Sequence, residues 1–282
     1  MENQSRGLKM DFKPVFVEGR DIDDTWYQLL QAVYERGRIY TKTSGSRTGM
    51  KVYAFDFVCG FIHYPHSRPL APRMPEGSTL PPPTSDDKIE KYFVDYLMNS
   101  HPSSKEHYRY STWICGSSDE HLRSGGNHTC PINQVEWILD HFKIHGYGNT
   151  HCYIVVGNPV SSLEDSKPYL ECPTCKKLYP RKKENICSTC NEKLLINEAL
   201  RPTTPCLRGL DFRIIDGILT TNVIYRSWDM FAWPENMGGF TMLNEYIAEQ
   251  LGDVEPGPLS FTSKSLHCPE DCIEILKMRI GK

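Results

Sequence analysis

The chain has 282 residues, of which 39% are hydrophobic and 24% charged, with a formal net charge of −3. This composition predicts a globular protein with a sizeable core and excludes a disordered or fibrous chain. The nearly balanced charge offers no general attraction for nucleic acid, and no apolar run approaches the ~20 residues of a membrane span. Because the first residues lack a signal-peptide core, we expect a cytoplasmic protein.

The first part of the chain predicts two helices separated by a strand region and by loops rich in glycine and proline. The apolar spacing within Thr25–Arg36 is helical, and Gly37 is a plausible stop. A second helix is predicted from Asp86 or Asp87 to about Met98. Between them we expect a glycine-punctuated loop at Gly45–Gly49, one long or two short strands over Lys51–Tyr64, and a loop over Pro65–Thr84.

The second part continues with mixed elements. Asp216-Gly217 is a strong hairpin dipeptide and predicts paired strands over Phe212–Tyr225. Further expected elements are helices over Pro131–His145 and Gly239–Leu251, and strands over Cys152–Gly157, Leu259–Lys264 and Cys272–Lys277, the last with a helical alternative. Strands and helices alternate without βαβ regularity. The sequence therefore predicts an α+β fold with a mainly antiparallel or mixed sheet.

Two CxxC pairs predict a zinc ribbon over residues 170–194. Cys172-Pro-Thr-Cys175 and Cys187-Ser-Thr-Cys190 can direct four thiolates to one tetrahedral ion. The polar segment between them is too small to form a core, so the metal would supply its folding energy. Four cysteines fill the coordination shell, which indicates a structural Zn²⁺. Iron in a rubredoxin-like site is the alternative.

A basic run lies inside this ribbon. Its members are Lys176, Lys177, Arg181, Lys182 and Lys183. A solvated surface is the ordinary interpretation, and contact with nucleic acid or a partner protein is the alternative.

Four segments after the ribbon carry a family resemblance. In chain order they are Pro205-Cys206, Arg226-Ser227-Trp228-Asp229, Pro234-Glu235-Asn236 and His267. Their order and spacing resemble the thymidylate synthase superfamily, which includes pyrimidine nucleotide hydroxymethylases, and look closest to its archaeal and phage-type members.

Upstream matches extend the resemblance over nearly the whole chain, 1–282. The loop carrying Arg47 resembles the family's phosphate-binding arginine loop, and Tyr108-Arg109-Tyr110 resembles its tyrosine segment. Asn133–Pro159 resembles the helix–strand unit that ends in Asn-Pro. The resemblance implies a thymidylate synthase-like mixed β-sheet with flanking helices, into which the ribbon is inserted.

The resemblance also implies a chemistry. Cys206 would add to carbon 6 of the pyrimidine, and a nearby Arg226 would lower the pKa of its thiol. Asn236 would pair with the uracil edge, and His267 would bind the sugar hydroxyl. The implied catalytic residues are Cys206, Glu90, Tyr110 and Asp229. The implied substrate-binding residues are Arg47, Arg226, Ser227, Asn236, His267 and His151.

The sequence departs from the family pattern at several positions. Thr150 and His151 stand where the family has an arginine pair that reaches across a dimer, and Pro269 stands where it has a sugar-binding tyrosine. Glu90 is the nearest candidate for the family's catalytic glutamate. The segment Lys277–Lys282 lacks a sealing hydrophobic tail, and a poorly sealed site would favour hydroxymethylation.

The function expected from these features is methylation of dUMP by a homodimer, with 5,10-methylenetetrahydrofolate or a methanopterin analogue as the donor. One alternative is a hydroxymethylase acting on dUMP, dCMP or CMP. Another is a zinc-ribbon binding protein on an inactive enzyme scaffold. Membrane and nucleic acid are not expected as partners.

Overall fold

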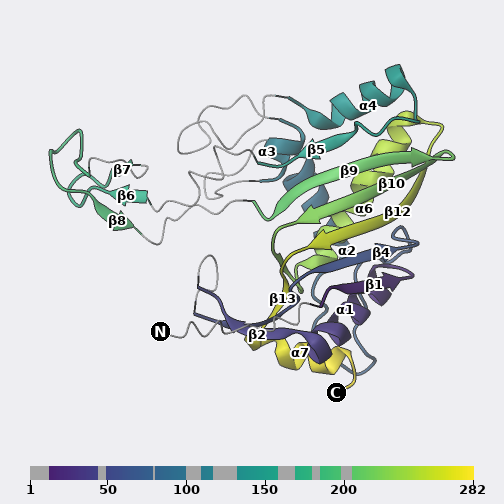
Figure 1. The fold of residues 1–282 in the computed structure, drawn as a ribbon, viewed down its shortest axis with the longest axis horizontal. Helices are drawn as coiled ribbons and strands as arrows, with labels where there is room; N and C mark the ends of the chain where they lie inside the picture. The colour runs from purple at the N-terminus through teal and green to yellow at the C-terminus, as the bar shows by residue number, and fades with distance from the viewer. Residues whose placement is uncertain are drawn as a thin grey trace, which may run out of the picture.

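A computed structural model describes residues 13–43, 49–78, 80–99, 109–116, 132–157, 169–179, 185–197 and 205–282. Helices and mixed sheets occur together, which confirms the α+β class (Figure 1). Within the described residues, none of the helices combines the length and hydrophobicity needed to cross a membrane.

The main sheet has six strands in the order β1-β4-β12-β10-β9-β5. The β1–β4 and β10–β12 pairs are parallel, whereas β4–β12, β10–β9 and β9–β5 are antiparallel. The strand bounds are β1 Val15–Gly19, β4 Val58–Ile62, β12 Glu255–Ser263, β10 Ile218–Tyr225, β9 Leu207–Ile215 and β5 Tyr153–Val155. The expected hairpin is confirmed, because Asp216 and Gly217 both adopt positive φ in the turn between β9 and β10.

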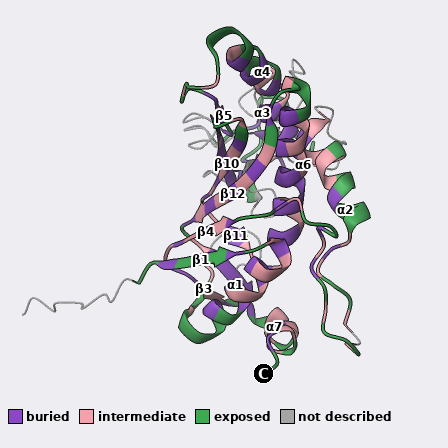
Figure 2. Ribbon diagram, turned by 90° about the vertical axis from the view of Figure 1, so that its right-hand side faces the viewer, coloured by how far each residue is buried: buried purple, intermediate pink, exposed green. Residues whose placement is uncertain are grey.

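Helices cover one face of this sheet. The long helix α6 (Trp233–Leu251) and the helix α1 (Ile22–Arg36) bury their apolar sides there (Figures 1 and 2). The fully buried Asn244 joins α6 to two strands, because its amide donates to Leu219 O and Thr221 Oγ1 and accepts from Gly257 N. A buried amide with three partners fixes the position of the helix over the sheet.

The helix α6 begins six residues before the predicted start. Gly238 and Gly239 lie inside it, where a Cβ would come within 2.7 Å of Ile89 and 2.5 Å of Tyr92. These glycines therefore allow close packing of helices rather than marking a helix end. Ile89 belongs to α2 (Asp86–Lys91), which continues as the π-helix η1 (Tyr92–Met98) and together with it confirms the predicted helix.

A second sheet has the order β11-β13-β3-β2. Its strands are β11 Trp228–Asp229, β13 Leu266–Pro269, β3 Lys51–Ala54 and β2 Arg38–Thr41. The region Lys51–Tyr64 thus forms two short strands, β3 and β4, which belong to different sheets. The loop predicted at Gly45–Gly49 lies outside the described residues except for Gly49.

The strand expected over Cys272–Lys277 is wrong. This segment ends in the helix α7 (Ile273–Arg279), which follows a 3-10 turn, η3 (Glu270–Cys272). Leu276 is buried, and the Arg279 guanidinium donates to Asp23 at 2.7 Å and lies over the rings of Trp26 and Tyr27. Packing against α1 therefore selects the helical alternative.

The remaining helices are α3 (Ser111–Ile114) and α4 (Gln134–His145), the latter starting three residues after its predicted beginning. Asn133 caps α4, because its side chain accepts from the backbone of Val135 and Glu136. The ribbon forms a third sheet, with the order β7-β6-β8 (Leu178–Tyr179, Tyr169–Glu171 and Leu195–Asn197).

Candidate active site

The β9–β10 hairpin brings Cys206 opposite Arg226. A register shift occurs between Ile224, which pairs with Gly209, and Tyr225, which pairs with Leu207. Arg208 is therefore the extra residue of a β-bulge in β9. Beyond the bulge, the Arg226 amide donates to the Cys206 carbonyl at 2.9 Å, and the guanidinium Nε donates to Pro205 O at 3.2 Å. The predicted nucleophile and its predicted arginine are thus neighbours.

Burial and positive charge act on the Cys206 thiol in opposite directions. Burial raises the pKa of this thiol above its ordinary value, while the charges of Arg226 and Lys42 lower it. Arg226 therefore acts on the pKa of the Cys206 thiol in the predicted direction, although the net shift of that pKa is upward. Burial disfavours the thiolate until the surroundings supply more positive charge.

Lys42 is a site residue that the sequence did not reveal. Its ammonium lies 3.4 Å from Nε2 of His267, whose Nδ1 lies 3.2 Å from Ser265 O. A carbonyl can only accept and an ammonium can only donate, so His267 carries its proton on Nδ1 and accepts at Nε2. Lys42 follows β2 directly. Its closeness in sequence to Arg47, the predicted phosphate-binding residue, was the only signal that the sequence offered for it.

Tyrosines surround the buried side of the nucleophile. The Tyr110 hydroxyl accepts from the Leu207 amide at 3.4 Å, one residue after Cys206. Its ring meets those of Tyr96 and Tyr225 edge-on, at 5.2 and 6.3 Å between centroids. The structure therefore places the predicted Tyr110 next to Cys206, together with two tyrosines that the sequence did not indicate.

The segment after Arg226 places the other predicted residues. Asp229 pairs with His267 between β11 and β13, and one of its carboxylate oxygens accepts from Phe231 N at 2.9 Å. Asn236 does not cap α6, because the cap is Ala232 and makes no side-chain bond. Instead, its Oδ1 accepts from the indole N–H of Trp228 at 2.8 Å. The half-buried Ser227 lies between Arg226 and Trp228.

Three cations line a hollow of about 400 Å³ beside this cluster. Arg208, Arg226 and Lys264 contribute their side chains to it. Such a group of guanidinium and ammonium donors suits a phosphate. The sequence indicated only Arg226, since the other two reach the hollow through the bulge in β9 and the end of β12.

Two predicted residues lie elsewhere, and a third is outside the described residues. Glu90 is exposed on α2. The residue of this helical segment whose ring meets Tyr110 is instead Tyr96, in η1. The exposed ring of His151 lies 5.6 Å from that of His141, next to α4. Arg47 lies outside the described residues. The catalytic role of Glu90 and the phosphate contacts of Arg47 and His151 stay predictions.

The four ribbon cysteines form a site compatible with zinc. Their sulfur atoms all lie within 4.8 Å of one another. In each CxxC knuckle, the backbone amide of the second cysteine approaches the sulfur of the first. The distances are 3.5 Å from Cys175 N to Cys172 Sγ and 3.4 Å from Cys190 N to Cys187 Sγ. The residues that follow the knuckles, Lys176 and Asn191, both have positive φ. This donor set and the repeated turn fit a tetrahedral ion.

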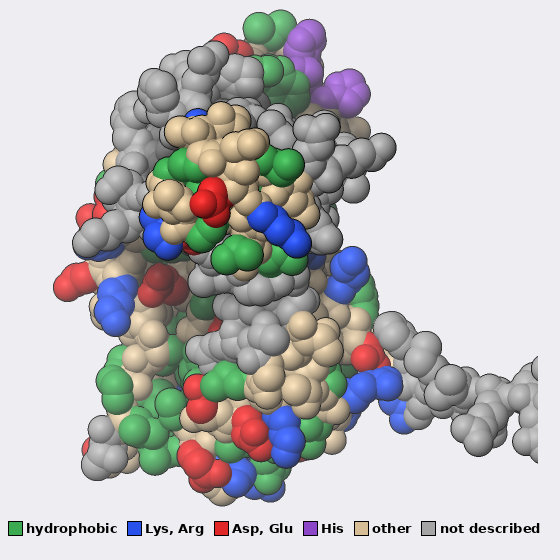
Figure 3. Space-filling view, turned by 90° about the vertical axis from the view of Figure 1, so that its left-hand side faces the viewer, with side chains coloured by type: hydrophobic (Ala, Val, Ile, Leu, Met, Phe, Trp, Pro, Cys, Tyr) green, Lys and Arg blue, Asp and Glu red, His purple; other side chains and the backbone are tan. Residues whose placement is uncertain are grey.

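The ribbon has its own small core, separate from that of the main domain. Leu170, Tyr179 and Leu194 pack there with two of the cysteines. The Tyr179 hydroxyl lies 3.1 Å from Cys187 Sγ, and this contact, together with the backbone amides of Cys190 and Thr189 and the Cys175 thiol, lowers the pKa of the Cys187 thiol to about 6. On the side of the molecule shown in Figure 3, basic, acidic and apolar side chains are mixed among the described residues rather than gathered by charge.

Comparison of the sequence with known proteins finds relatives of this chain. No family model matches the chain. Proteins named "Putative thymidylate synthase" are similar to it, and the one from Methanosarcina barkeri is 38% identical over 252 residues, which are 89% of this chain and 88% of the relative. The protein of Methanosarcina acetivorans is 22% identical over the same shares. The protein of Methanothermobacter thermautotrophicus is 39% identical over 67 residues, or 23% of this chain and 30% of the relative.

The raised pKa of Cys206 predicts how its alkylation depends on pH. Because the thiolate is the reactive form, the rate of iodoacetamide labelling at Cys206 should rise about tenfold per pH unit between pH 7 and 9. Arg226→Gln should slow labelling severalfold at each pH, whereas Arg213→Gln, at an exposed position of β9, should not. Mass spectrometry of the Cys206 peptide gives the rates. A plateau below pH 8 would show that the thiol is already ionised.

Proposed function

Because the chain belongs to the thymidylate synthase family, we propose that it transfers one carbon to carbon 5 of a pyrimidine nucleotide, and that this reaction is the methylation of dUMP. The observation that carries the proposal is the position of Cys206 at the start of β9, under the charges of Arg226 and Lys42. His267 and Tyr110 stand beside these residues in the same cluster.

The reaction follows from what each residue can do. The Cys206 thiolate adds to carbon 6, and the electron pair of the C5–C6 double bond moves through carbon 5 onto O4. Carbon 5 then becomes nucleophilic and forms a bond to the transferred carbon. Carbon 5 then loses its proton as the transferred carbon separates from the donor nitrogen. That carbon would be reduced to a methyl group by a hydride from the donor, and the thiolate leaves carbon 6, which restores the double bond. The Tyr110 hydroxyl, held beside Leu207, is our candidate for handling the proton lost from carbon 5.

Substrate binding would position the pyrimidine at the thiol, whose pKa Arg226 and Lys42 lower. Arg226 lines the cationic hollow with Arg208 and Lys264, where a nucleotide phosphate would bind. Nucleotide binding would also exclude water and hold carbon 6 against the thiol. The His267 Nδ1 proton is committed to Ser265 O and Nε2 faces the Lys42 ammonium, so Nε2 would accept a bond from a sugar hydroxyl only in place of that ammonium.

The donor would be a reduced folate or a methanopterin analogue. Tyr92 and Tyr96 stack at 5.3 Å and are half-buried near Tyr110, so they offer flat surfaces that fit a pterin ring. When bound, this donor would supply the one-carbon unit and the hydride that reduces it to a methyl group. The chain's own contribution is the thiol, the phosphate-binding cations and the fixed amide of Asn236.

The enzymatic proposal predicts a strict need for Cys206. Cys206→Ala should lower turnover of dUMP with methylenetetrahydrofolate by at least about hundredfold, since the covalent step is lost. Cys272→Ala, a half-buried cysteine of η3, should keep activity. Product mass identifies the outcome: a methyl group supports the proposal, and a hydroxymethyl group identifies the hydroxymethylase alternative. No product from dUMP, dCMP, UMP or CMP would favour the inactive scaffold.

We further propose that the ribbon binds one structural Zn²⁺ through Cys172, Cys175, Cys187 and Cys190. The support is the cluster of four sulfurs and the small size of the ribbon's core. A core of three apolar side chains provides little folding energy, so the metal would supply most of it.

Metal analysis tests this proposal. The purified protein should hold one zinc per chain, and Cys190→Ser should remove it, while Cys59→Ser on β4 should not. Chelation should release the ribbon to proteolysis before it reduces turnover, because the metal has no open coordination position. Protein without zinc or iron would contradict the proposal, and iron alone would identify a rubredoxin-like site.

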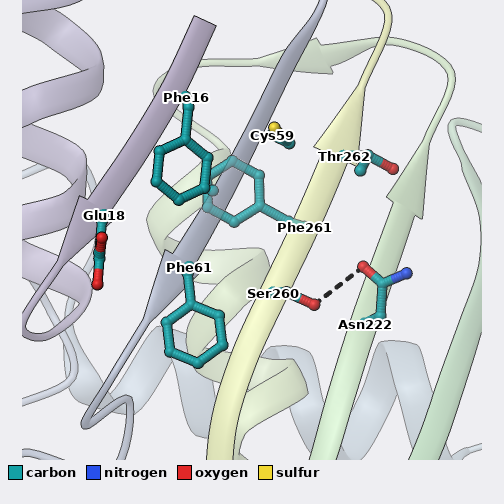
Figure 4. Close-up of a pocket in the computed structure, with 9 residues that line it drawn as sticks. Phe16, Glu18, Cys59, Phe61, Asn222, Ser260, Phe261 and Thr262 are labelled. Atoms are coloured by element: carbon teal, nitrogen blue, oxygen red, sulfur yellow. Dashed lines mark hydrogen bonds between the residues drawn. The ribbon is translucent and has the colours of Figure 1, made fainter.

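We also propose a homodimer formed by the outer face of the six-stranded sheet. Phe16, Phe61 and Cys59 stand on the face opposite the helices, beside Asn222 and Ser260, and line a hollow there (Figure 4). Phe16 is 61% exposed. A sheet face that carries aromatic side chains is suited to burial against a second copy.

Light scattering tests the dimer. Phe16→Asp should dissociate it at micromolar concentration, because the charge would be buried at the interface. Ile144→Asp, which changes a residue 74% exposed on α4, should leave the dimer intact. A wild-type protein that stays monomeric at micromolar concentration would overturn this proposal.

A further inference from the structure

The side chain of Asn236 is held from behind by Trp228. The indole N–H of Trp228 donates to Oδ1 of Asn236 at 2.8 Å. An indole nitrogen only donates, so the amide atom that faces it must be the oxygen. The contact therefore fixes which way the amide points, a choice that an asparagine alone leaves open.

Trp228 itself has little freedom to move. Its ring stacks on that of Tyr225 with 3.7 Å between centroids and 5° between planes, and it meets Phe261 at a right angle. Its backbone amide donates to Ser265 O at 2.7 Å, which pins β11 to β13. The side chain is only 2% exposed. The donor that faces Asn236 is thus built into the packed core.

The orientation of this amide decides which base it matches. With Oδ1 held toward Trp228, its second lone pair can accept from N3–H of uracil, while the amide nitrogen donates to O4. Turned by 180°, the same amide would accept from the amino group of cytosine and donate to its N3. An asparagine that could turn freely would therefore match both bases. The turned amide would also oppose its NH₂ to the Trp228 N–H, donor against donor.

We propose that Trp228 is a positioning residue for base choice, which makes Asn236 selective for uracil by preventing the amide from turning. The inference rests on the proposed function, in which Asn236 meets the base. Trp228 acts only through Asn236 and touches no reacting atom. Base preference is then set partly outside the residues that contact the nucleotide.

The first experiment tests the contact without any nucleotide. Exchange of the indole N–H groups with solvent is followed by NMR in the wild type and in Asn236→Ala. The Trp228 N–H should exchange at least about tenfold faster in the variant, because its acceptor is gone. Trp26, whose N–H donates to Met230 O at 3.0 Å, is the internal control and should not change. Unchanged exchange at Trp228 would overturn the proposal.

The second experiment measures the dissociation constants of dUMP and dCMP. Trp228→Phe keeps an aromatic ring against Tyr225 but lacks the N–H, so preference for dUMP should fall by about tenfold, mainly through tighter dCMP binding. In an Asn236→Ala background the same change should leave the ratio within about twofold. If Trp228→Phe does not fold, 3-benzothienylalanine at this position replaces N–H by sulfur with the same shape and carries the comparison.

The outcomes separate the two levels of the proposal. A wild type that binds neither nucleotide would overturn the proposed function and this inference with it. A wild type that prefers dUMP, with an unchanged ratio in Trp228→Phe, would overturn the inference alone. An equal change of ratio in the Asn236→Ala background would also overturn it, because Trp228 would then act by another route.

Discussion

The register of the β9–β10 hairpin is the constraint on which the site depends. The turn at Asp216-Gly217 fixes one register, in which Cys206 would stand opposite Ser227, and the bulge at Arg208 shifts it by one residue so that Arg226 takes that place. A shift by one residue exchanges the two faces of a strand. The bulge therefore determines that a guanidinium lies beside the thiol, and it also turns Arg208 toward the cationic hollow.

The second link between distant segments is the small sheet. In it, β13 pairs with β11 on one side and with β3 on the other, so His267 stands beside Asp229 and opposite Ala54. β3 in turn pairs antiparallel with β2, and Lys42 directly follows the last residue of β2. These pairings bring Lys42 to His267 across 225 residues of sequence. Strand pairing thus brings the proposed site residues Lys42 and His267 together.

The sequence predicted the parts of the fold that short-range patterns determine. The hairpin dipeptide, the CxxC spacing and the apolar period of α1 each act within a few residues, and these predictions agree with the structure. The strands β1, β11 and β13 are short and form only by pairing with distant segments, so their sequences carry no signal of their own. Asn236 illustrates the same limit, because its bond to Trp228 forms only once β11 and the start of α6 are folded against each other.

The place of the ribbon in the chain explains how the site can tolerate it. Residues 156–206 separate β5 from β9, yet these two strands are antiparallel neighbours in the sheet, with Tyr153 opposite Asp211 and Val155 opposite Gly209. The amide of Val156 still donates to Arg208 O at 3.2 Å, beside the bulge. An insertion between adjacent strands lengthens their connection without changing their pairing, and loop-closure entropy rises only slowly with length. The register that places Cys206 against Arg226 is set on the other edge of β9, by β10, so the ribbon can be added or lost without moving the nucleophile.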